Sequence, residues 1–212
     1  MKVQLENVEP REIEARSFEI ITRELGDFPL VPGTEDIVKR CIHTSADFDY
    51  AKNLVFSEHA VELAEDAIKR GASIVTDTNM GKAGINKKVL SYFGGEALCF
   101  MADEDVCKRA KEQGITRAVA SMDKAAKLKC PLIFAIGNAP TALVRLYELI
   151  KEGKLKPELV IGVPVGFVNV VQAKELILTA NAPYIVARGR KGGSNVAAAI
   201  CNALIYLLGR PD

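Results

Sequence analysis

Short, mostly apolar runs alternate along the chain with longer segments in which apolar residues recur every three or four positions. A run that is apolar on both faces is typical of a strand buried in a parallel sheet, whereas the longer period is typical of a helix. Five runs of the first kind stand out, at residues 73–77, 97–101, 132–136, 159–163 and 184–187. The pattern therefore predicts five strands separated by helices.

Further helices are predicted at the two ends of the chain. Residues 10–25 and 35–43 predict two helices ahead of the first strand, and residues 195–208 predict a strongly apolar last helix. Such alternation places helices on both faces of one sheet, joined by right-handed crossovers. We therefore expect an α/β fold, a single doubly wound domain over residues 1–212 with a five-stranded, mainly parallel sheet.

The loops that follow the strands are where chemistry is expected, because doubly wound sheets bind ligands beyond the carboxyl ends of their strands. Four of these loops mix glycine with polar residues, at 76–84, 137–141, 162–169 and 187–195. None contains the G-x-G-x-x-G or G-x-x-x-x-G-K-[ST] pattern with which dinucleotides and nucleoside triphosphates are held. A nucleotide-dependent enzyme is therefore disfavoured.

The last of these loops is the strongest candidate for anion binding. It carries Arg188, Arg190 and Lys191 among glycines, and Ser194 with Asn195 then opens a helix. Free N–H groups at a helix start favour a carboxylate or a phosphate. The alternative is a solvated turn whose cations only keep the protein in solution. Arg188 is the best candidate ligand, because it directly follows the strand.

His43 is the candidate proton donor, since histidine exchanges a proton near neutral pH. In the helix 35–43 it lies three residues after Arg40, so both side chains project from one face and place a fixed cation beside a titratable group. The alternatives are that Arg40 pairs with Asp36, four residues earlier, and that His43 only caps the helix. Apolar residues form the opposite, buried stripe of this helix: Ile37, Val38, Cys41 and Ile42.

Two further polar residues occupy unusual helix positions. Ser17 lies on the same stripe as Ile13, Ile20 and Ile21, where packing favours an apolar residue, although its hydroxyl can bond back to its own helix. Arg117 stands near the start of a helix, where the helix dipole disfavours a cation, so we read it as a hint of an external anion.

Composition excludes several classes of function. The chain has 28 Lys and Arg against 27 Asp and Glu, so no overall basic field attracts nucleic acid. No apolar run is long enough to span a membrane, and residues 1–7 lack the apolar core of a signal peptide, so we expect a cytoplasmic protein. Five single cysteines and two histidines predict neither a disulfide framework nor a protein-held metal.

Together these residues resemble a known family, the precorrin-8X methylmutases (precorrin isomerases), which act late in the assembly of the corrin ring of vitamin B12. The resemblance extends over nearly the whole chain. Five blocks in the same order carry it, at residues 16–21, 39–44, 135–143, 162–168 and 188–194.

The resemblance implies an isomerase that moves a methyl group from C11 to C12 of the corrinoid ring by a [1,5]-sigmatropic shift. The product would be hydrogenobyrinic acid or, from the cobalt-containing substrate, cobyrinic acid. The family's histidine falls on His43, which would act as the acid that protonates the macrocycle.

The substrate of this family carries many carboxylates on its rim, and the resemblance assigns their binding to arginines. These are Arg40, Arg117 and Arg188, and charge-assisted contacts from them would hold the ring relative to the acid. The family's further substrate contacts fall on Ser17 and Asn86. Relatives can carry Thr at the position of Asn86, which is a departure from the family pattern.

The resemblance also implies that the reaction needs no cofactor and that any cobalt belongs to the substrate. Residues 42–49 look more like the anaerobic-pathway branch of the family, which favours the cobalt-containing substrate. A homodimer with its active site near the subunit interface is expected. The main alternative function is a non-catalytic carrier that binds the same corrinoid without converting it.

Overall fold

A six-stranded sheet forms the centre of the computed structural model, which describes residues 6–209. The strand order is β1-β6-β5-β4-β2-β3, and every neighbouring pair is parallel except β1 with β6. The strands are β1 (Leu54–Phe56), β2 (Ser73–Thr76), β3 (Ala97–Leu98), β4 (Leu132–Ile136), β5 (Leu159–Gly162) and β6 (Tyr184–Ala187). The prediction of an α/β fold with a mainly parallel sheet is confirmed.

The predicted and observed strands differ at the two edges of the sheet. The expectation of five strands was wrong by one, because β1 pairs with β6 through only three residues and is too short to give a periodic signal. At the other edge, β3 ends at Leu98 and not at residue 101, since only Ala97 and Leu98 have partners on β2. Both differences arise where a strand has a neighbour on one side only.

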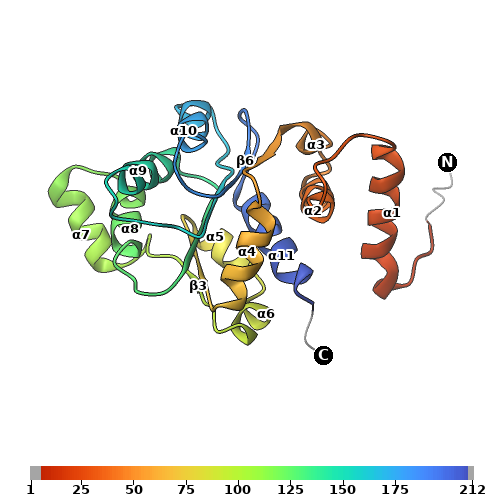
Figure 1. Ribbon diagram of the computed structural model, residues 1–212, viewed down its shortest axis with the longest axis horizontal. Helices are drawn as coiled ribbons and strands as arrows, with labels where there is room; N and C mark the ends of the chain where they lie inside the picture. The colour runs from red at the N-terminus through yellow and green to blue at the C-terminus, as the bar shows by residue number, and fades with distance from the viewer. Residues whose placement is uncertain (1–5, 210–212) are drawn as a thin grey trace, which may run out of the picture.

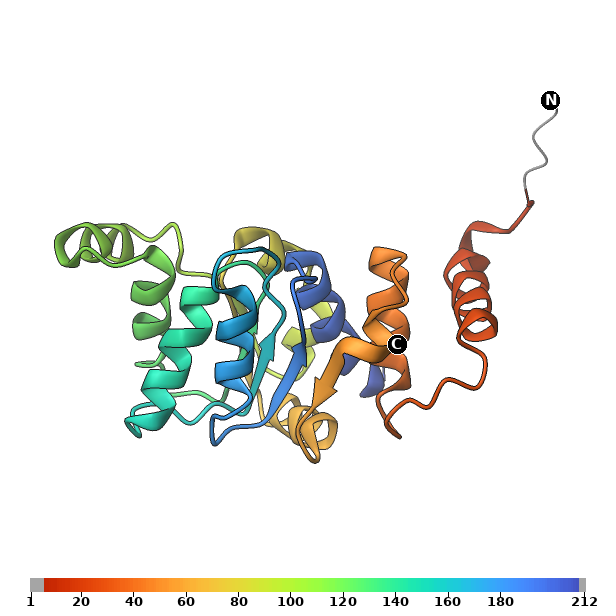
Figure 2. The same ribbon diagram turned by 90° about the horizontal axis from the view of Figure 1, so that it is seen from above.

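Helices cover both faces of the sheet, as Figures 1 and 2 show. On one face, α8, α9 and α10 pack with residues of β4 and β5 into one apolar core, and on the other α2, α4 and α11 form a second core. No helix within residues 6–209 is long and apolar enough to cross a membrane. The longer helices on the sheet faces are α2 (Glu35–Ser45), α4 (Ala60–Lys69), α8 (Arg117–Ala125), α9 (Pro140–Lys151), α10 (Val170–Ile177) and α11 (Ser194–Leu207), and α7 (Glu104–Gln113) packs on α8.

The helix α1 (Ile13–Leu25) lies outermost, beyond α2, at the right of Figure 2. A short 3-10 turn (Pro10–Glu12) leads into it, so the predicted helix over 10–25 is confirmed with this modification. Ile21 is its one buried residue, and it belongs to the core that α2 and α11 share. Most of the surface of α1 is therefore available for other contacts.

The segment 76–84, expected as a loop, contains a short helix, α5 (Asn79–Gly84). The hydroxyl of Thr78 accepts a hydrogen bond from the N–H of Gly81 at 2.9 Å and so caps this helix. A second short helix, α6 (Lys87–Tyr92), is capped by Asn86. A third, α3 (Tyr50–Asn53), precedes β1. Helices of four to six residues are too short to show a helical period in the sequence.

The strand order reverses between β2 and β4. The chain passes from β2 outward to β3 and then returns, so that β4, β5 and β6 follow one another on the other side of β2. At such a switch point two connections leave the sheet in opposite directions and open a crevice at the carboxyl edge, where ligands of doubly wound proteins bind.

Candidate active site

Asp77 closes the crevice at the switch point. Its buried carboxylate accepts hydrogen bonds from the N–H groups of Gly137 at 2.9 Å and Asn138 at 2.8 Å, and a further one from Ala139. Burial raises the pKa of this carboxyl, and the three N–H donors counteract that shift. The protein's own carboxylate thus accepts from the three N–H donors at the start of the loop after β4.

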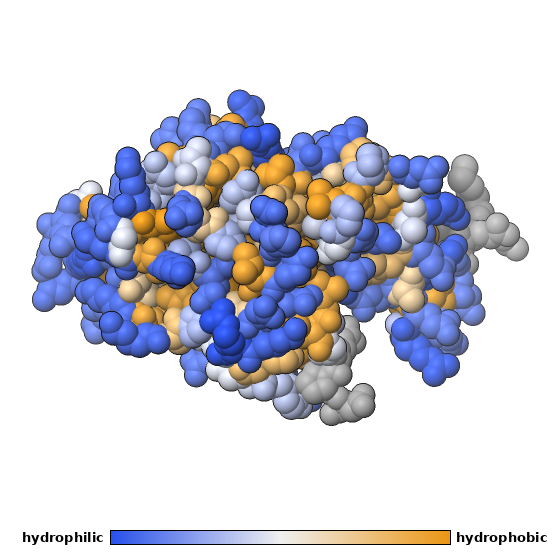
Figure 3. Space-filling view, in the orientation of Figure 1, coloured by the Kyte–Doolittle hydropathy of each residue, from blue (hydrophilic) through white to orange (hydrophobic). Residues whose placement is uncertain are grey.

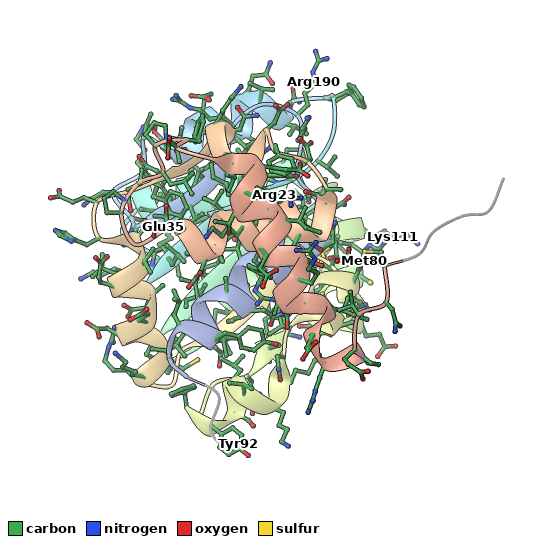
Figure 4. The ribbon with its side chains drawn as sticks, turned by 90° about the vertical axis from the view of Figure 1, so that its right-hand side faces the viewer. Arg23, Glu35, Met80, Tyr92, Lys111 and Arg190 are labelled. Atoms are coloured by element: carbon green, nitrogen blue, oxygen red, sulfur yellow. The ribbon has the colours of Figure 1, made fainter. Side chains whose placement is uncertain are left out.

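The end of α2 brings His43 to the same edge of the sheet. Figure 4 looks onto α1 from outside and shows Met80 and Arg190, which follow β2 and β6, toward the right, while Glu35 lies on the left. Because Glu35 is the first residue of α2, this helix runs toward the carboxyl edge, and His43 lies in its last turn with an exposed side chain. The candidate acid is therefore open to a ligand.

A cavity of about 250 Å³ lies between α2, α5 and α11 with His43 on its wall. Gly84 lets α5 approach α11 closely, because a Cβ atom there would lie 2.8 Å from the Cβ of Ala198. The lining combines one cation, one imidazole and two amides with small side chains: Arg40, His43, Thr44, Gly84, Asn195, Ala198, Ala199 and Asn202. Arg40 and His43 thus face one cavity, as their spacing predicted.

A second cavity, of about 440 Å³, lies between α1 and α2, and His43 lines this one too. Ser17 is on its wall, so the structure brings the predicted Ser17 near His43. Its hydroxyl donates to the carbonyl of Ile13 at 2.8 Å, which is the bond back to its own helix that was the alternative. The hydroxyl oxygen can still accept a hydrogen bond from a ligand. Figure 3 shows the face of the molecule opposite to the carboxyl edge, where mostly hydrophilic side chains cover α1 at the right.

Arg40 lies between two aromatic rings. The carbon of its guanidinium is 5.2 Å from the ring centroid of Phe18 on α1 and 5.1 Å from that of Tyr206 on α11. Its Nη1 atom donates to Glu14 at 2.9 Å, so the observed ion pair is with α1 and not with Asp36. A guanidinium has five N–H donors in a planar fork, so Arg40 can hold this pair and still bind a carboxylate.

Asn86 reaches the site only through another residue. Its side-chain oxygen accepts from the N–H of Val89 at 3.2 Å and caps α6, while its Nδ2 donates to the hydroxyl of Tyr206 at 3.0 Å. The ring of Tyr206 in turn contacts the guanidinium of Arg40. Asn86 therefore supports the position of Arg40, and the structure brings its side chain into neither of the two cavities that His43 lines.

Arg117 and Arg188 lie at the carboxyl edge but outside both cavities of His43. Arg117 is the exposed first residue of α8, and its Nη1 lies 3.4 Å from the carbonyl of Met101. A contact of 3.1 Å between the hydroxyls of Thr116 and Thr141 ties this helix start to the loop after β4. Arg188 follows β6 and pairs with Glu175 at 3.1 Å.

The loop 188–193 is held by contacts and is not a freely solvated turn. Arg190 lies over the ring of Phe167, 5.4 Å from its centroid. Lys191 bonds to both Asp47 and Asp49 at 2.6 Å. Asp47 comes four residues after His43, so this pair joins the basic loop to the end of the helix that carries the acid.

Three residues of the site were not identified from the sequence, Asn202, Phe18 and Tyr206, and Asn195 was identified only as part of a helix start. A signal for Asn202 was present, because it lies seven residues after Asn195 on one face of the otherwise apolar α11. The roles of Phe18 and Tyr206 depend on the packing of α1 and α11 around α2, which has no local signature. Within residues 6–209 no three side chains of His, Cys, Asp or Glu are grouped so that they could hold a metal ion.

Comparison with known proteins gives matches over almost the full length. A family model described as precorrin-8X methylmutase matches residues 12–207. The cobalt-precorrin-8 methylmutase of Salmonella typhimurium is 47% identical over 206 residues, which cover 94% of this chain and 96% of that protein. The enzyme of the same name from Priestia megaterium is 46% identical over 200 residues, covering 94% and 89%. The solved precorrin-8X methyl mutase of Thermus thermophilus matches with a TM-score of 0.85 at 41% identity, covering 93% of this chain and 98% of that one.

Proposed function

Because the chain belongs to the precorrin-8X methylmutase family, we propose that it is the isomerase that moves a methyl group from C11 to C12 of precorrin-8X or its cobalt form. The product is hydrogenobyrinic acid or cobyrinic acid, on the route to cobalamin. The observation that carries the proposal is that His43, with an exposed imidazole, lines one cavity together with Arg40.

His43 acts as a general acid in this proposal. The imidazolium gives a proton to the macrocycle, the methyl group migrates within the same molecule with its bonding electrons, and the proton returns to His43. No atom is gained or lost overall, so the reaction consumes no co-reactant and needs no cofactor. The protein supplies the proton and the orientation of the ring, each of which lowers the barrier.

Arginines bind the carboxylates of the substrate. We assign this role to Arg40, which is closest to His43, and to Arg117 and Arg188 farther along the carboxyl edge. A corrinoid is wide enough for its rim to contact several points of this edge at once. Ser17 contributes a hydroxyl from α1, and Asn86 acts through Tyr206.

We further propose that the natural substrate contains cobalt. The two relatives with 46% and 47% identity are both named for the cobalt-containing substrate, which supports this assignment. The macrocycle would hold the metal, so the protein needs no ligands of its own for it.

A homodimer accounts for the apolar side chains at the carboxyl edge. Large apolar residues in monomeric proteins seldom cluster on the surface, and such clusters mark interaction sites. The exposed large apolar residues at this edge include Met80, Val165, Phe167 and Val168. We expect a molar mass twice that of the chain in light scattering, and Phe167→Ser weakens the dimer if this edge forms the interface.

We also propose that residues 1–212 act as one precorrin isomerase domain, which the family match over residues 12–207 supports. A cytoplasmic location fits an enzyme that takes its substrate from a preceding step of corrinoid synthesis.

Conversion of the substrate tests the proposed function. The purified protein is incubated with precorrin-8X and, separately, with its cobalt form, and the visible spectrum is followed. Conversion of either one supports the isomerase, and the faster of the two identifies the natural substrate. A complex that forms with both and converts neither is the result expected of a corrinoid carrier.

A further inference from the structure

Lys174 on α10 is a fully buried cation, with 0% of the residue exposed. Its Nζ atom donates to the carbonyl of Gly189 at 2.8 Å and to that of Lys191 at 2.8 Å. No carboxylate of residues 6–209 lies within ion-pair distance of it. A buried ammonium is thus held by two backbone carbonyls of the basic loop.

Such a group is costly to the fold. Removing an ammonium from water disfavours its charged form, and burial lowers the pKa of Lys174 to about 8. An apolar side chain at this position would avoid this cost. The presence of a charged lysine here is therefore explained by the backbone carbonyls that it binds.

The loop 188–193, to which Lys174 binds, has an unusual backbone. Gly189 and Gly193 have φ angles of +79° and +138°, which favour glycine. At Gly192 a Cβ atom would lie 2.0 Å from the carbonyl oxygen of Val163, so the chain passes very close to the end of β5. The carbonyls of the loop turn inward onto Lys174, while the side chains of Arg188 and Arg190 are exposed.

The same arrangement concentrates positive charge. The ammonium lies behind a loop of six residues that already carries three cations, Arg188, Arg190 and Lys191. The carboxylates Glu175, Asp47 and Asp49 pair with two of the three from outside the loop. Lys174 therefore adds a fourth positive charge, on the inner side of the loop.

We propose that Lys174 is a positioning residue for corrinoid binding, which fixes the loop 188–193 so that its cations meet the carboxylates of the substrate. The inference rests on the proposed function, because it assigns this loop to substrate binding. Lys174 is buried and touches no substrate, so it has no part in the proton transfer.

The test compares Lys174→Met with Lys156→Met, a control that removes one positive charge from an exposed lysine before β5. Trypsin reports the state of the loop directly, since Arg188, Arg190 and Lys191 are all cleavage sites. We expect cleavage in this loop to become about tenfold faster in Lys174→Met than in the control, because local opening exposes the backbone.

Binding of the corrinoid product is measured by titration with cobyrinic acid. We expect Kd to rise about tenfold in Lys174→Met, with kcat at saturation within about threefold of the wild type, because binding and not chemistry is affected. Unchanged cleavage, or unchanged Kd despite faster cleavage, overturns the proposal. If the wild type itself binds no corrinoid, the proposed function fails, while cleavage still tests the hold of Lys174 on the loop. Should Lys174→Met not fold, Lys174→Gln, which removes the charge, replaces it in both measurements, and the same increases in cleavage and Kd, of smaller size, are expected because its amide keeps a neutral donor.

Discussion

The ring of Phe18 stacks on the imidazole of His43, with centroids 5.4 Å apart and planes inclined by 24°. The same ring faces the guanidinium of Arg40 at 5.2 Å. One side chain of α1 thus touches both the candidate acid and the cation beside it. The orientation of α1 therefore bears directly on the chemistry, although α1 lies at the periphery of the fold (Figure 2).

Phe18→Leu is expected to lower kcat by about 10-fold, because an imidazole without its stacking partner spends less time in the reactive orientation. Phe18→Tyr keeps the ring and should retain the wild-type rate within about twofold. Steady-state kinetics of both variants measure this. Equal kcat values for the Leu and Tyr variants would show that the stack does not position His43.

Arg40→Lys is expected to raise KM by about tenfold, because lysine keeps the charge but loses the planar fork and the stacking on Phe18 and Tyr206. Arg23→Lys is the matched control, since Arg23 is an exposed arginine of α1 that lines neither cavity. If KM equals the wild-type value in both variants, Arg40 does not bind the substrate.

Asp77→Ala is expected to destabilise the protein by about 3 kcal/mol, because it leaves three buried or partly buried backbone N–H groups without their acceptor. Asp66→Ala, at an exposed aspartate of α4, should change stability by less than about 0.5 kcal/mol. Urea unfolding of the two variants gives both values. If the two variants have similar urea midpoints, the hydrogen bonds of Asp77 to the loop after β4 do not stabilise the protein.

The central part of the fold could be predicted because buried parallel strands leave continuous apolar runs and amphipathic helices leave a regular period. Ile37, Val38, Cys41 and Ile42 are buried as the stripe of α2 predicted. The edge strand β1 could not be predicted, since its three residues show no period. The helix α5 was missed for the same reason, and its cap at Thr78 was the one available sign.

The candidate site was predictable only in part. The spacing of Arg40 and His43 on one helix placed them on one face, and the structure puts both in one cavity. The partner of Arg40 was not predictable, because Glu14 lies 26 residues away and meets it only through the packing of α1 on α2. Lys174 gave no signal, since nothing in the sequence distinguishes a buried lysine from an exposed one.

The free energy of unfolding should depend on pH through Lys174. Its pKa is about 8 in the folded protein against 10.5 ordinarily, so between these values unfolding takes up a proton and stability rises with pH. The rise attributable to this group is on the order of 3 kcal/mol from pH 8 to 10.5, and it should be absent from Lys174→Met. Denaturant unfolding of both proteins across this range measures the difference. If the free energies of unfolding of the wild type and Lys174→Met change with pH in parallel, the lowered pKa of Lys174 is contradicted.

The most direct measurement compares turnover by His43→Ala and His59→Ala, the two histidine variants that the chain allows. Both side chains are exposed, and of the two only His43 lines the cavity with Arg40. We expect His43→Ala to abolish conversion of the corrinoid while Kd stays within about tenfold, and His59→Ala to match the wild type. Conversion by His43→Ala at the wild-type rate would contradict its role as the acid.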